Sequence, residues 1–501
     1  MARGGSAGRG LHALLALQSV MRLDCFLLPS PLPRASLSMS ASTIAAPPLG
    51  YNVALVALGC PKNLVDAEVM LGDLQRQGCR IVPEPADADV IIVNTCAFVE
   101  DAKAESIAAI VEAGQLKSDR SVAARGLFVT GCLAQRYAEE LSSEVPEVDA
   151  IVGFESYSEL PEQIMRTLGR SADSAASSSP SVLVGSPTVP FRPETDRWQL
   201  TAPHFAYVRV AEGCDHSCTF CAIPGFRGGF RSKPFDVVVA EAERLVEKGV
   251  RELVLIAEDT NVYGSDWGDA DSRRLSDLLK ALSELPQLRW IRLLYCYPSY
   301  FSEELIDAIA SIDKVVKYID MPLQHLSPSV LKRMQRPGGH ATRKLVEKLR
   351  DRIPGLVLRT TLISGFPGES EAEHRELVEI AAALRFERGG AFAYSQEDGT
   401  PAAEYEGQLD EHTKKARRDE ISALFEAQSR AWAEAQVGQT LRVMVDAMDG
   451  LDAVARTEFD APDIDARVLI PSMPLAAGTE LNVKVFAVDG SDLIAEPVIE
   501  T

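Results

Sequence analysis

Six of the nine cysteines come at or shortly after the end of a short apolar run, and this placement constrains the fold more than any other feature of the sequence. Cys60, Cys96 and Cys132, here called the sheet triad, each end such a run. Because the carboxyl ends of parallel strands gather at one edge of a sheet, we expect these three thiols to meet there. Helix candidates at residues 63–77, 100–116 and 133–141 follow the three runs, which indicates a parallel α/β domain.

A second α/β series begins near residue 205, after a stretch rich in Ser and Pro. It contains six strand candidates with helices between them, which predicts a partial (β/α)6 barrel, since a full barrel needs two more units. After a long helix near residues 412–436, short runs separated by turn residues predict a small all-β barrel or sandwich. The six strands are expected at residues 205–210, 253–257, 290–295, 317–321, 357–363 and 390–394.

These patterns predict a multidomain α/β chain with five segments. Residues 1–50 carry a single acid, Asp24, and read as a leader that is disordered or removed. The leader is either an organelle transit peptide or a translated stretch upstream of Met39. The other segments are an N-terminal α/β domain at 51–165, a linker at 166–200, the partial barrel at 201–432 and the all-β domain at 433–501.

Composition restricts the environment and the partners of the chain. Apolar residues make up 46% of the 501 residues, which is typical of a globular protein. Nine cysteines are too few for a disulfide scaffold and indicate reduced thiols in a cytoplasmic compartment, or in an organelle if the leader is a transit peptide. No run reaches the roughly 18 apolar residues that a membrane span needs. The net charge of −21 favours a basic partner over nucleic acid, although it is also compatible with solubility alone.

The motif CDHSCTFC at residues 214–221 carries the strongest chemical signal. Cys214, Cys218 and Cys221, here called the loop triad, can hold three irons of a 4Fe–4S cluster. The fourth iron is then free to bind S-adenosylmethionine (SAM), at the carboxyl edge where barrel active sites lie. The alternative is a zinc site with His216 or a distant cysteine as the fourth ligand.

The sheet triad supplies a second set of three thiols. Three ligands again leave one iron open, here suited to carry a sulfur atom that is to be transferred. The alternative is that these are ordinary buried core thiols, since free cysteine often packs as a small apolar residue. Cys25, Cys79 and Cys296 have no comparable placement, and we expect them to be structural.

Several motifs together resemble the methylthiotransferase family of radical SAM enzymes. Besides the loop triad, they are LGCPKNLVD at 58–66, RGGFRSKP at 227–234, YIDMPLQH at 318–325, SGFPGE at 364–369 and DAPDID at 460–465. The sequence is most similar to the branch that modifies an aspartate of the twelfth small-subunit ribosomal protein. The resemblance extends over residues 52–499.

The resemblance implies an N-terminal methylthiotransferase domain, a central radical SAM domain and a C-terminal TRAM domain. It implies that the sheet triad and the loop triad each ligate a 4Fe–4S cluster, and that two SAM molecules are used per turnover. One donates a methyl group to sulfur, and the other yields the radical that removes hydrogen from the β-carbon of the aspartate. An electron donor such as flavodoxin or ferredoxin is also implied.

The SAM-binding residues are expected from their positions near strand ends. Phe220 is expected near the adenine, and Glu258, Gln324 and Arg359 are expected to face the mouth of the barrel. Each of these three is otherwise an ordinary polar residue near a strand end. Gly365 and Gly368 are expected to shape a tight turn that lets the backbone approach the cofactor.

The charge of the C-terminal domain bears on the substrate. Residues 433–501 contain 4 basic and 13 acidic residues, a net charge of −9, which repels phosphates and suits a basic ribosomal protein, free or within the ribosome. The alternatives are a methylthiotransferase that acts on adenosine in tRNA and an RNA-binding module with structural clusters. We expect the basic run at residues 414–418 to be a solvated helix face, and Trp198 and Trp432 to be packing residues.

Overall fold

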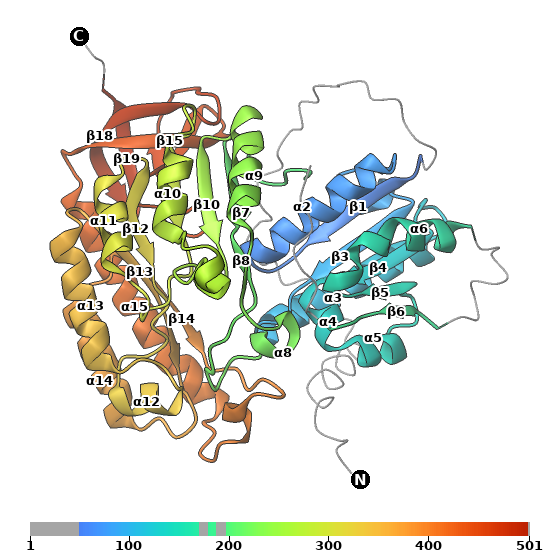
Figure 1. Cartoon of the computed structure of the whole chain (residues 1–501), viewed down its shortest axis with the longest axis horizontal. Helices are drawn as coiled ribbons and strands as arrows, with labels where there is room; N and C mark the ends of the chain where they lie inside the picture. The colour runs from blue at the N-terminus through green and yellow to red at the C-terminus, as the bar shows by residue number, and fades with distance from the viewer. Residues whose placement is uncertain (1–49, 170–178, 187–196, 499–501) are drawn as a thin grey trace. The chain divides into compact units, whose positions relative to one another are not determined.

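The computed structural model describes residues 50–169, 179–186 and 197–498 of the chain (Figure 1). These residues form two compact units. The first contains the chain up to Leu200 together with Gly225–Gly228 and Glu397–Gly399, and the second contains the remainder. The predicted leader, apart from Gly50, and Cys25 lie outside the described residues.

The first unit is built on a parallel six-stranded sheet. Its strands are β1 (Asn52–Ala57), β2 (Arg80–Ile81), β3 (Val90–Thr95), β4 (Gly126–Thr130), β5 (Ala150–Val152) and β6 (Ser181–Leu183), in the order β2-β1-β3-β4-β5-β6. Its helices are α2 (Pro61–Arg76), α3 (Glu100–Ser118), α4 (Gly131–Arg136), α5 (Ala138–Glu144) and α6 (Leu160–Leu168). Every residue of β3 and β4 is buried, which explains their continuous apolar runs.

The order of the strands reverses between β1 and β3, because β2 returns to the outer side of β1 and β3 pairs on its inner side. Such a switch point leaves a crevice at the carboxyl ends of the two strands, where parallel α/β sheets bind their ligands. The two ends are followed by Cys60 and Cys96, and the neighbouring β4 is followed by Cys132. The predicted parallel domain is confirmed.

Two details of the first unit differ from the sequence predictions. The helix expected at residues 133–141 is broken at Tyr137, whose backbone (φ −130°, ψ 38°) separates α4 from α5. Part of the predicted linker 166–200 is not a linker, because β6 pairs in parallel with β5 and completes the sheet. The exact domain boundaries remain predictions.

The second unit contains the predicted partial barrel. Its strands are β7 (Phe205–Arg209), β10 (Glu252–Ile256), β11 (Trp290–Leu293), β12 (Val315–Asp320), β13 (Val357–Ser364) and β14 (Arg388–Ala393), all parallel and adjacent in chain order. Its larger helices are α9 (Phe235–Glu247), α10 (Leu275–Ser283), α11 (Glu303–Ser311), α13 (Gly339–Arg352) and α14 (Glu371–Leu384). Six sequential parallel strands confirm the (β/α)6 prediction.

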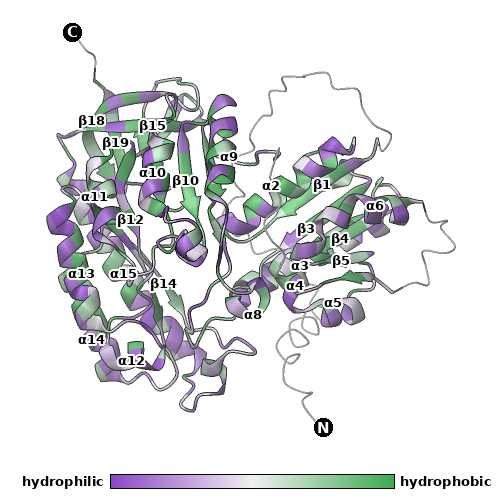
Figure 2. Ribbon diagram, viewed as in Figure 1, coloured by the Kyte–Doolittle hydropathy of each residue, from purple (hydrophilic) through white to green (hydrophobic). Residues whose placement is uncertain are grey.

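Shorter elements complete the strand connections. They are the strands β8 (Ala211–Glu212) and β9 (Arg231–Ser232), the helices α8 (Ile223–Arg227) and α12 (Pro328–Arg333), and four 3-10 turns at Pro85–Asp87, Phe154–Glu159, Ser265–Ala270 and Pro401–Glu404. The sequence patterns did not reveal α13, because it buries few side chains, among them Val346 and Leu349. Figure 2 shows the contrast between the hydrophobic β10 and the hydrophilic α13.

The C-terminal strands close into a barrel, which decides between the barrel and the sandwich expected from the sequence. The barrel follows the long helix α15 (Glu411–Ala435) and contains β15 (Thr440–Asp449), β16 (Asp452–Thr457), β17 (Val468–Ile470), β18 (Glu480–Asp489) and β19 (Asp492–Pro497). The strand β19 closes the barrel by pairing with both β17 and β18.

Buried ion pairs attach this barrel to the six-stranded sheet within the second unit. Glu252 of β10 forms an ion pair with Arg292 of β11, with 2.8 Å between Oε1 and Nε, and a second ion pair with Arg456 of β16. Arg388 of β14 pairs with Asp460 at 2.6 Å. Since buried charges are tolerated only when paired, these contacts fix the segment after β16 against the sheet.

The sequence prediction that the basic run at residues 414–418 is a solvated helix face is wrong for part of the run. Lys414 and Arg417 are buried, and Arg417 pairs with Glu369 at 3.1 Å. Only part of the run is solvated, because α15 packs along β13 and β14. No helix in the described part of the chain combines the length and hydrophobicity that crossing a bilayer would require.

Two adjacent glycines of β14 allow a test of the packing of α15. A Cβ added at Gly389 would lie 2.6 Å from the Phe425 ring of α15, whereas a Cβ at Gly390 has no heavy atom within 4 Å. We therefore expect Gly389→Ala to lower the free energy of unfolding by about 1–3 kcal/mol, the usual cost of overpacking. Gly390→Ala is the matched control with little change. Urea unfolding measures both, and equal effects would contradict the packing.

Candidate functional site

The first unit brings the sheet triad together, as the sequence predicted. Cys60 is the residue before α2, Cys96 follows β3, and Cys132 is the second residue of α4. The three thiols are close enough to influence one another. Burial raises the pKa of Cys132 to about 12 and that of Cys96 to about 11; the Cys60 thiol also raises both pKa values, whereas Arg227 lowers both. Ligation of iron by such thiols therefore releases protons.

Two glycines in left-handed conformations allow the ligand loops to approach each other. At Gly59 (φ +89°) an added Cβ would lie 2.9 Å from the Cys96 sulfur. At Gly131 (φ +90°) an added Cβ would meet the backbone of Thr95. A side chain at either position would therefore push two cysteine loops apart.

Asn63 ties two of the cysteine loops together from the first turns of α2. Its Nδ2 donates hydrogen bonds to the carbonyl of Leu58 at 3.0 Å and to that of Thr95 at 2.7 Å. Its Oδ1 lies 3.7 Å from the Cys132 sulfur. One buried amide thus contacts all three ligand segments, a role that the sequence analysis did not assign.

Arg227 is a second residue that the sequence analysis missed. It belongs to the short segment grouped with the first unit, and it is buried. Its Nη2 lies 3.1 Å from Asp66 Oδ2 and 3.7 Å from the Cys132 sulfur. Arg227 and Asp66 belong to two motifs of the sequence analysis, RGGFRSKP and LGCPKNLVD. The sequence showed the order of these motifs but not that the two residues are in contact.

The other segment grouped with the first unit also contacts this region. Glu397 is buried and pairs with Arg136 at 2.7 Å and with Lys103 at 3.2 Å. Arg136 also donates a hydrogen bond to the carbonyl of Ala97, next to Cys96, at 3.2 Å. The Cys96 loop is therefore held by a charged cluster of the first unit.

The second unit brings the loop triad together. Gly213 (φ +72°) turns the chain after β8, and the Cys221 amide donates to the Cys218 carbonyl at 3.1 Å. Burial, with smaller contributions from the neighbouring thiols and Glu258, raises the pKa of Cys214 to about 12 and that of Cys221 to about 11. Glu258 therefore lies near this triad, and a contact of Glu258 with SAM stays a prediction.

His216, the fourth ligand of the zinc alternative, has partners within the second unit. Its Nε2 lies 2.7 Å from Asp259 Oδ2, and its ring stacks on Tyr297 at 3.7 Å between centroids. Within the described ranges, no three His, Cys, Asp or Glu side chains are arranged to hold a single metal ion. Thiolates of an iron–sulfur cluster bind separate irons, so they need not converge on one point.

Two further residues hold the loop triad, and the sequence patterns did not reveal them. Thr219 is buried, and its backbone amide and hydroxyl donate to the carbonyls of Met334 at 3.1 Å and Arg333 at 3.0 Å. Arg336 stacks its guanidinium over the Tyr297 ring at 4.1 Å and lies 3.7 Å from the Cys218 sulfur. The end of α12 thus supports the cysteine loop.

The expected tight turn after β13 is present. Gly365 (φ +79°) leaves no room for a Cβ, which would lie 2.6 Å from Lys414 Cγ, so the conformation also serves the packing of α15. The Gly365 and Phe366 amides donate to Glu369 Oε2 at 2.7 and 3.0 Å. Phe220 packs against the apolar cluster that includes Phe366, which joins this turn to the loop triad.

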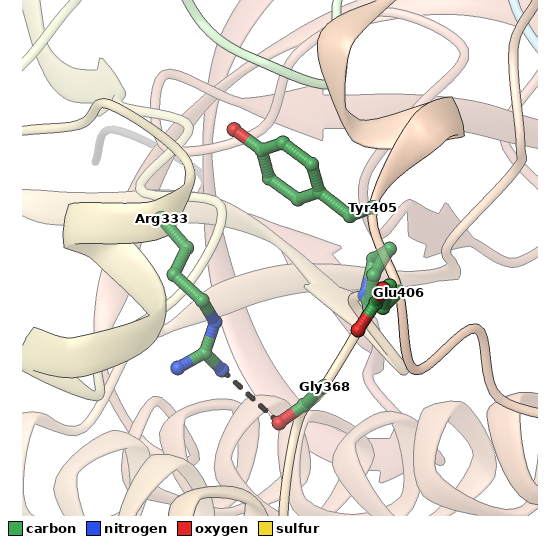
Figure 3. Close-up of a pocket in the computed structure, with 5 residues that line it drawn as sticks. Arg333, Gly368, Tyr405 and Glu406 are labelled. Atoms are coloured by element: carbon green, nitrogen blue, oxygen red, sulfur yellow. Dashed lines mark hydrogen bonds between the residues drawn. The ribbon is translucent and has the colours of Figure 1, made fainter.

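Gly368 (φ +72°) lines a shallow pocket of about 380 Å³ together with Arg333, Pro367, Tyr405 and Glu406 (Figure 3). In Figure 3 the Arg333 guanidinium donates to the Gly368 carbonyl, at 3.4 Å. The pocket therefore lies between α12 and the turn after β13. A role of Gly368 in cofactor binding stays a prediction.

Gln324 and Arg359 occupy different environments. Gln324 (φ +68°) contacts β13 through its backbone, because its backbone N–H donates a hydrogen bond to the Thr361 carbonyl at 2.8 Å. Arg359 pairs with Asp320 at 3.0 Å and with Asp465 at 3.4 Å. The charge of Arg359 is thus already balanced by two carboxylates that the sequence analysis did not connect with it, and a contact with SAM stays a prediction.

The remaining sequence predictions concern packing. Cys79 and Cys296 are buried in the cores of the first and second units, as expected of structural thiols. Trp432 packs against the core of the C-terminal barrel, with Arg388 over its ring at 4.2 Å, which confirms it as a packing residue. The backbone amide of Trp198 donates to the Glu68 carbonyl at 2.9 Å.

Three family models match the chain, and two of them include the two cysteine triads. The uncharacterized protein family UPF0004 matches residues 52–153, which include the sheet triad. The Radical SAM superfamily matches residues 208–381, which include the loop triad, and a TRAM domain matches residues 437–498. The fold and the two cysteine sites therefore define an enzyme of the radical SAM class.

Full-length relatives narrow the class to one family. The chain is 42% identical to the ribosomal protein uS12 methylthiotransferase RimO of Akkermansia muciniphila, over 89% of this chain and 99% of the relative. It is 43% identical to the RimO protein of Desulfitobacterium hafniense, over 90% of this chain and 99% of the relative. The chain belongs to the RimO family of radical SAM methylthiotransferases.

A solved structure supports the fold. The chain resembles the radical SAM methyltransferase TsrM of Kitasatospora setae, solved with cobalamin and a [4Fe-4S] cluster, with a TM-score of 0.50. The match covers 71% of this chain and 74% of TsrM at 16% identity. At this identity, the likeness concerns the arrangement of the α/β elements.

The contacts of Asn63 lead to a prediction about the sheet triad. Asn63→Ala removes two hydrogen-bond donors from buried carbonyls, so we expect the free energy of unfolding to fall by about 1–3 kcal/mol. We also expect less iron to be retained after reconstitution, because two ligand loops lose their common anchor. Asn52→Ala is the control, since Asn52 donates its side-chain bond at an exposed site. Equal iron retention in the two variants would contradict the role of Asn63.

The carboxylate of Glu369 predicts a dependence of stability on pH. Burial raises its pKa, but His325 and His374, whose ring nitrogens lie 3.6 and 3.4 Å from the carboxylate, and the charge of Arg417 outweigh burial and lower it. The resulting stabilisation is present above the ordinary glutamate value of about 4.3 and is lost as the pH falls. The pKa of His374 is raised, because its bonds to Glu369 and Glu420 outweigh burial, so its contribution is lost as the pH rises.

We therefore expect Glu369→Gln to destabilise the protein most between about pH 5 and pH 6.5, where both contributions are present. The difference from the parent should shrink as the pH falls below about 4, because Glu369 then takes up a proton in the unfolded parent while it stays ionised in the folded parent. Urea unfolding at a series of pH values measures this. Glu426→Gln, at an exposed position of α15, is the control. A difference that does not vary with pH would disprove the electrostatic origin.

Proposed function

We propose that this chain attaches a methylthio group to the β-carbon of an aspartate in ribosomal protein uS12. The observation that supports this most is the presence of two separate sets of three cysteines, each at the carboxyl edge of its own parallel sheet. Membership of the RimO family and full coverage of its members agree with this activity. The names of these relatives give ribosomal protein uS12 as their substrate.

The two sets of thiols fit iron–sulfur clusters. In each set, three cysteines of one unit influence one another electrostatically, as ligands of a single cluster must. Each set offers three ligands, so one iron of each 4Fe–4S cluster is left for a non-protein ligand. The loop triad, with Phe220 and the turn at Gly365 packed beside it, would hold the cluster that binds SAM.

The chemistry requires these cofactors, because the β-carbon of an aspartate is not acidic enough for general-base catalysis. When bound, the clusters and SAM supply a carbon-centred radical, a sulfur atom and a methyl group. The chain itself positions the ligands and excludes water. Thr219 and Arg336 restrain the loop triad, while Asn63, Gly59 and Gly131 restrain the sheet triad.

The acidic C-terminal barrel favours a protein substrate over tRNA. The turns and ends of its strands expose Asp449, Asp489 and Glu496, within a domain whose net charge is −9. Such a surface attracts a basic ribosomal protein and repels a phosphate backbone. Cytoplasm that contains ribosomes and keeps thiols reduced is the compartment that fits, with a flavodoxin or ferredoxin as the electron donor.

The test uses the full chain, reconstituted anaerobically with iron and sulfide and supplied with SAM, a reductant and uS12. We expect mass spectrometry to find a methylthio group in place of one hydrogen on a single aspartate of uS12. Cys218→Ala should abolish SAM cleavage, whereas Cys132→Ala should keep SAM cleavage and lose sulfur transfer. Cys79→Ala, a buried thiol outside both triads, is the control.

Two results would count against the proposal. Modification of an adenosine in tRNA, with uS12 unchanged, would support the alternative substrate. Failure of the chain to retain iron in either triad, with no cleavage of SAM, would contradict the two-cluster function itself.

A further inference from the structure

We propose that Arg227 is a positioning residue that sets the reduction potential of the cluster held by the sheet triad, acting through Cys132 and balanced by Asp66. This inference rests on the proposed function, because it requires a cluster at the sheet triad. It goes further by assigning the electrostatic control of that cluster to two residues outside the ligand set.

The contacts of Arg227 place one buried guanidinium against one ligand. Its Nη2 lies 3.7 Å from the Cys132 sulfur, 3.4 Å from Asn63 Oδ1 and 3.1 Å from Asp66 Oδ2. The guanidinium also stacks over the Phe154 ring, with its central carbon 4.5 Å from the centroid. Four contacts, two with α2, one with α4 and one with the turn at Phe154, fix the side chain in a single orientation.

Burial makes this charge effective. The side chains of Arg227 and Asp66 are 4% and 6% exposed, so water screens their charges poorly. Arginine keeps its proton at any accessible pH, so the positive charge is permanent. The carboxylate in contact with Arg227 is that of Asp66, while the charge of Glu105 acts on Cys96.

A fixed positive charge next to a cysteine ligand stabilises the more negative, reduced form of the cluster. Charge, hydrogen bonds to sulfur and solvent exposure are among the factors that set the potentials of such clusters. The guanidinium supplies the first two at Cys132, and Asp66 partly offsets the first. Removing the positive charge should therefore lower the potential, and removing the negative charge should raise it.

Asp66 lies on α2, which begins directly after Cys60, while Cys132 is the second residue of α4. The ion pair thus joins the segments that carry two of the three ligands. A purely structural role for the pair would change the amount of iron retained without moving the potential of the cluster that forms. The potential is therefore the measurement that distinguishes the two roles.

The experiment uses the full chain with Cys214, Cys218 and Cys221 replaced by alanine, so that reconstitution with iron and sulfide loads only the sheet triad. Reduction with dithionite is followed by electron paramagnetic resonance at controlled potentials. In this background we expect Arg227→Gln to lower the midpoint potential and Asp66→Asn to raise it. Arg227→Lys keeps the charge and should remain closer to the parent.

Arg166→Gln is the matched control, because Arg166 is an exposed arginine of the same unit that bonds to Ser181. Its midpoint should equal that of the parent. If Arg227→Gln fails to fold, the upward shift in Asp66→Asn carries the test. Unchanged midpoints in the Arg227 and Asp66 variants, with a cluster present, would overturn this inference alone. A parent that retains no iron at the sheet triad would overturn the two-cluster function as well.

Discussion

The structure depends on one constraint, the gathering of parallel strand ends at one edge of a sheet. In the first unit the order of strands reverses between β1 and β3, and the segments after β1, β3 and β4 carry the sheet triad. Because β3 and β4 are buried along their whole length, the positions of Cys96 and Cys132 are set by a rigid core. Cysteines that are far apart in sequence can then meet without a long loop between them.

The edge of a sheet alone does not hold thiols at the right distances, and buried polar groups complete the sites. Asn63 and Arg227 contact the segments of the sheet triad, and Thr219 anchors the loop triad to the end of α12. Each of these groups is costly to bury without partners, so each contact is strongly specified once the fold has formed. The glycines at 59 and 131 let the backbones approach closely enough for these bonds.

The sequence predicted the elements that have strong periodicity and missed those that do not. Buried strands such as β3 gave apolar runs, so their ends, and the cysteines that follow, could be placed. β6 is only three residues long and lies between Ser- and Pro-rich stretches, and α13 has a polar surface, so neither gave a clear pattern. The partners of Arg227 and Arg359 are far away in the sequence, and no local pattern of charges reveals which carboxylate an arginine will meet.

The distribution of ion pairs explains why the surface of the C-terminal barrel presents mainly negative charge. Three of its four basic side chains are already paired: Arg456 is buried against Glu252, Arg442 pairs with Glu458, and Arg467 pairs with Asp492. The attachment to the six-stranded sheet thus uses the charge of Arg456, while acids such as Asp449 and Asp489 stay exposed. A phosphate backbone would meet few available cations on this surface. A lysine- and arginine-rich protein would instead be attracted over a distance of about one Debye length, roughly 8 Å at physiological salt.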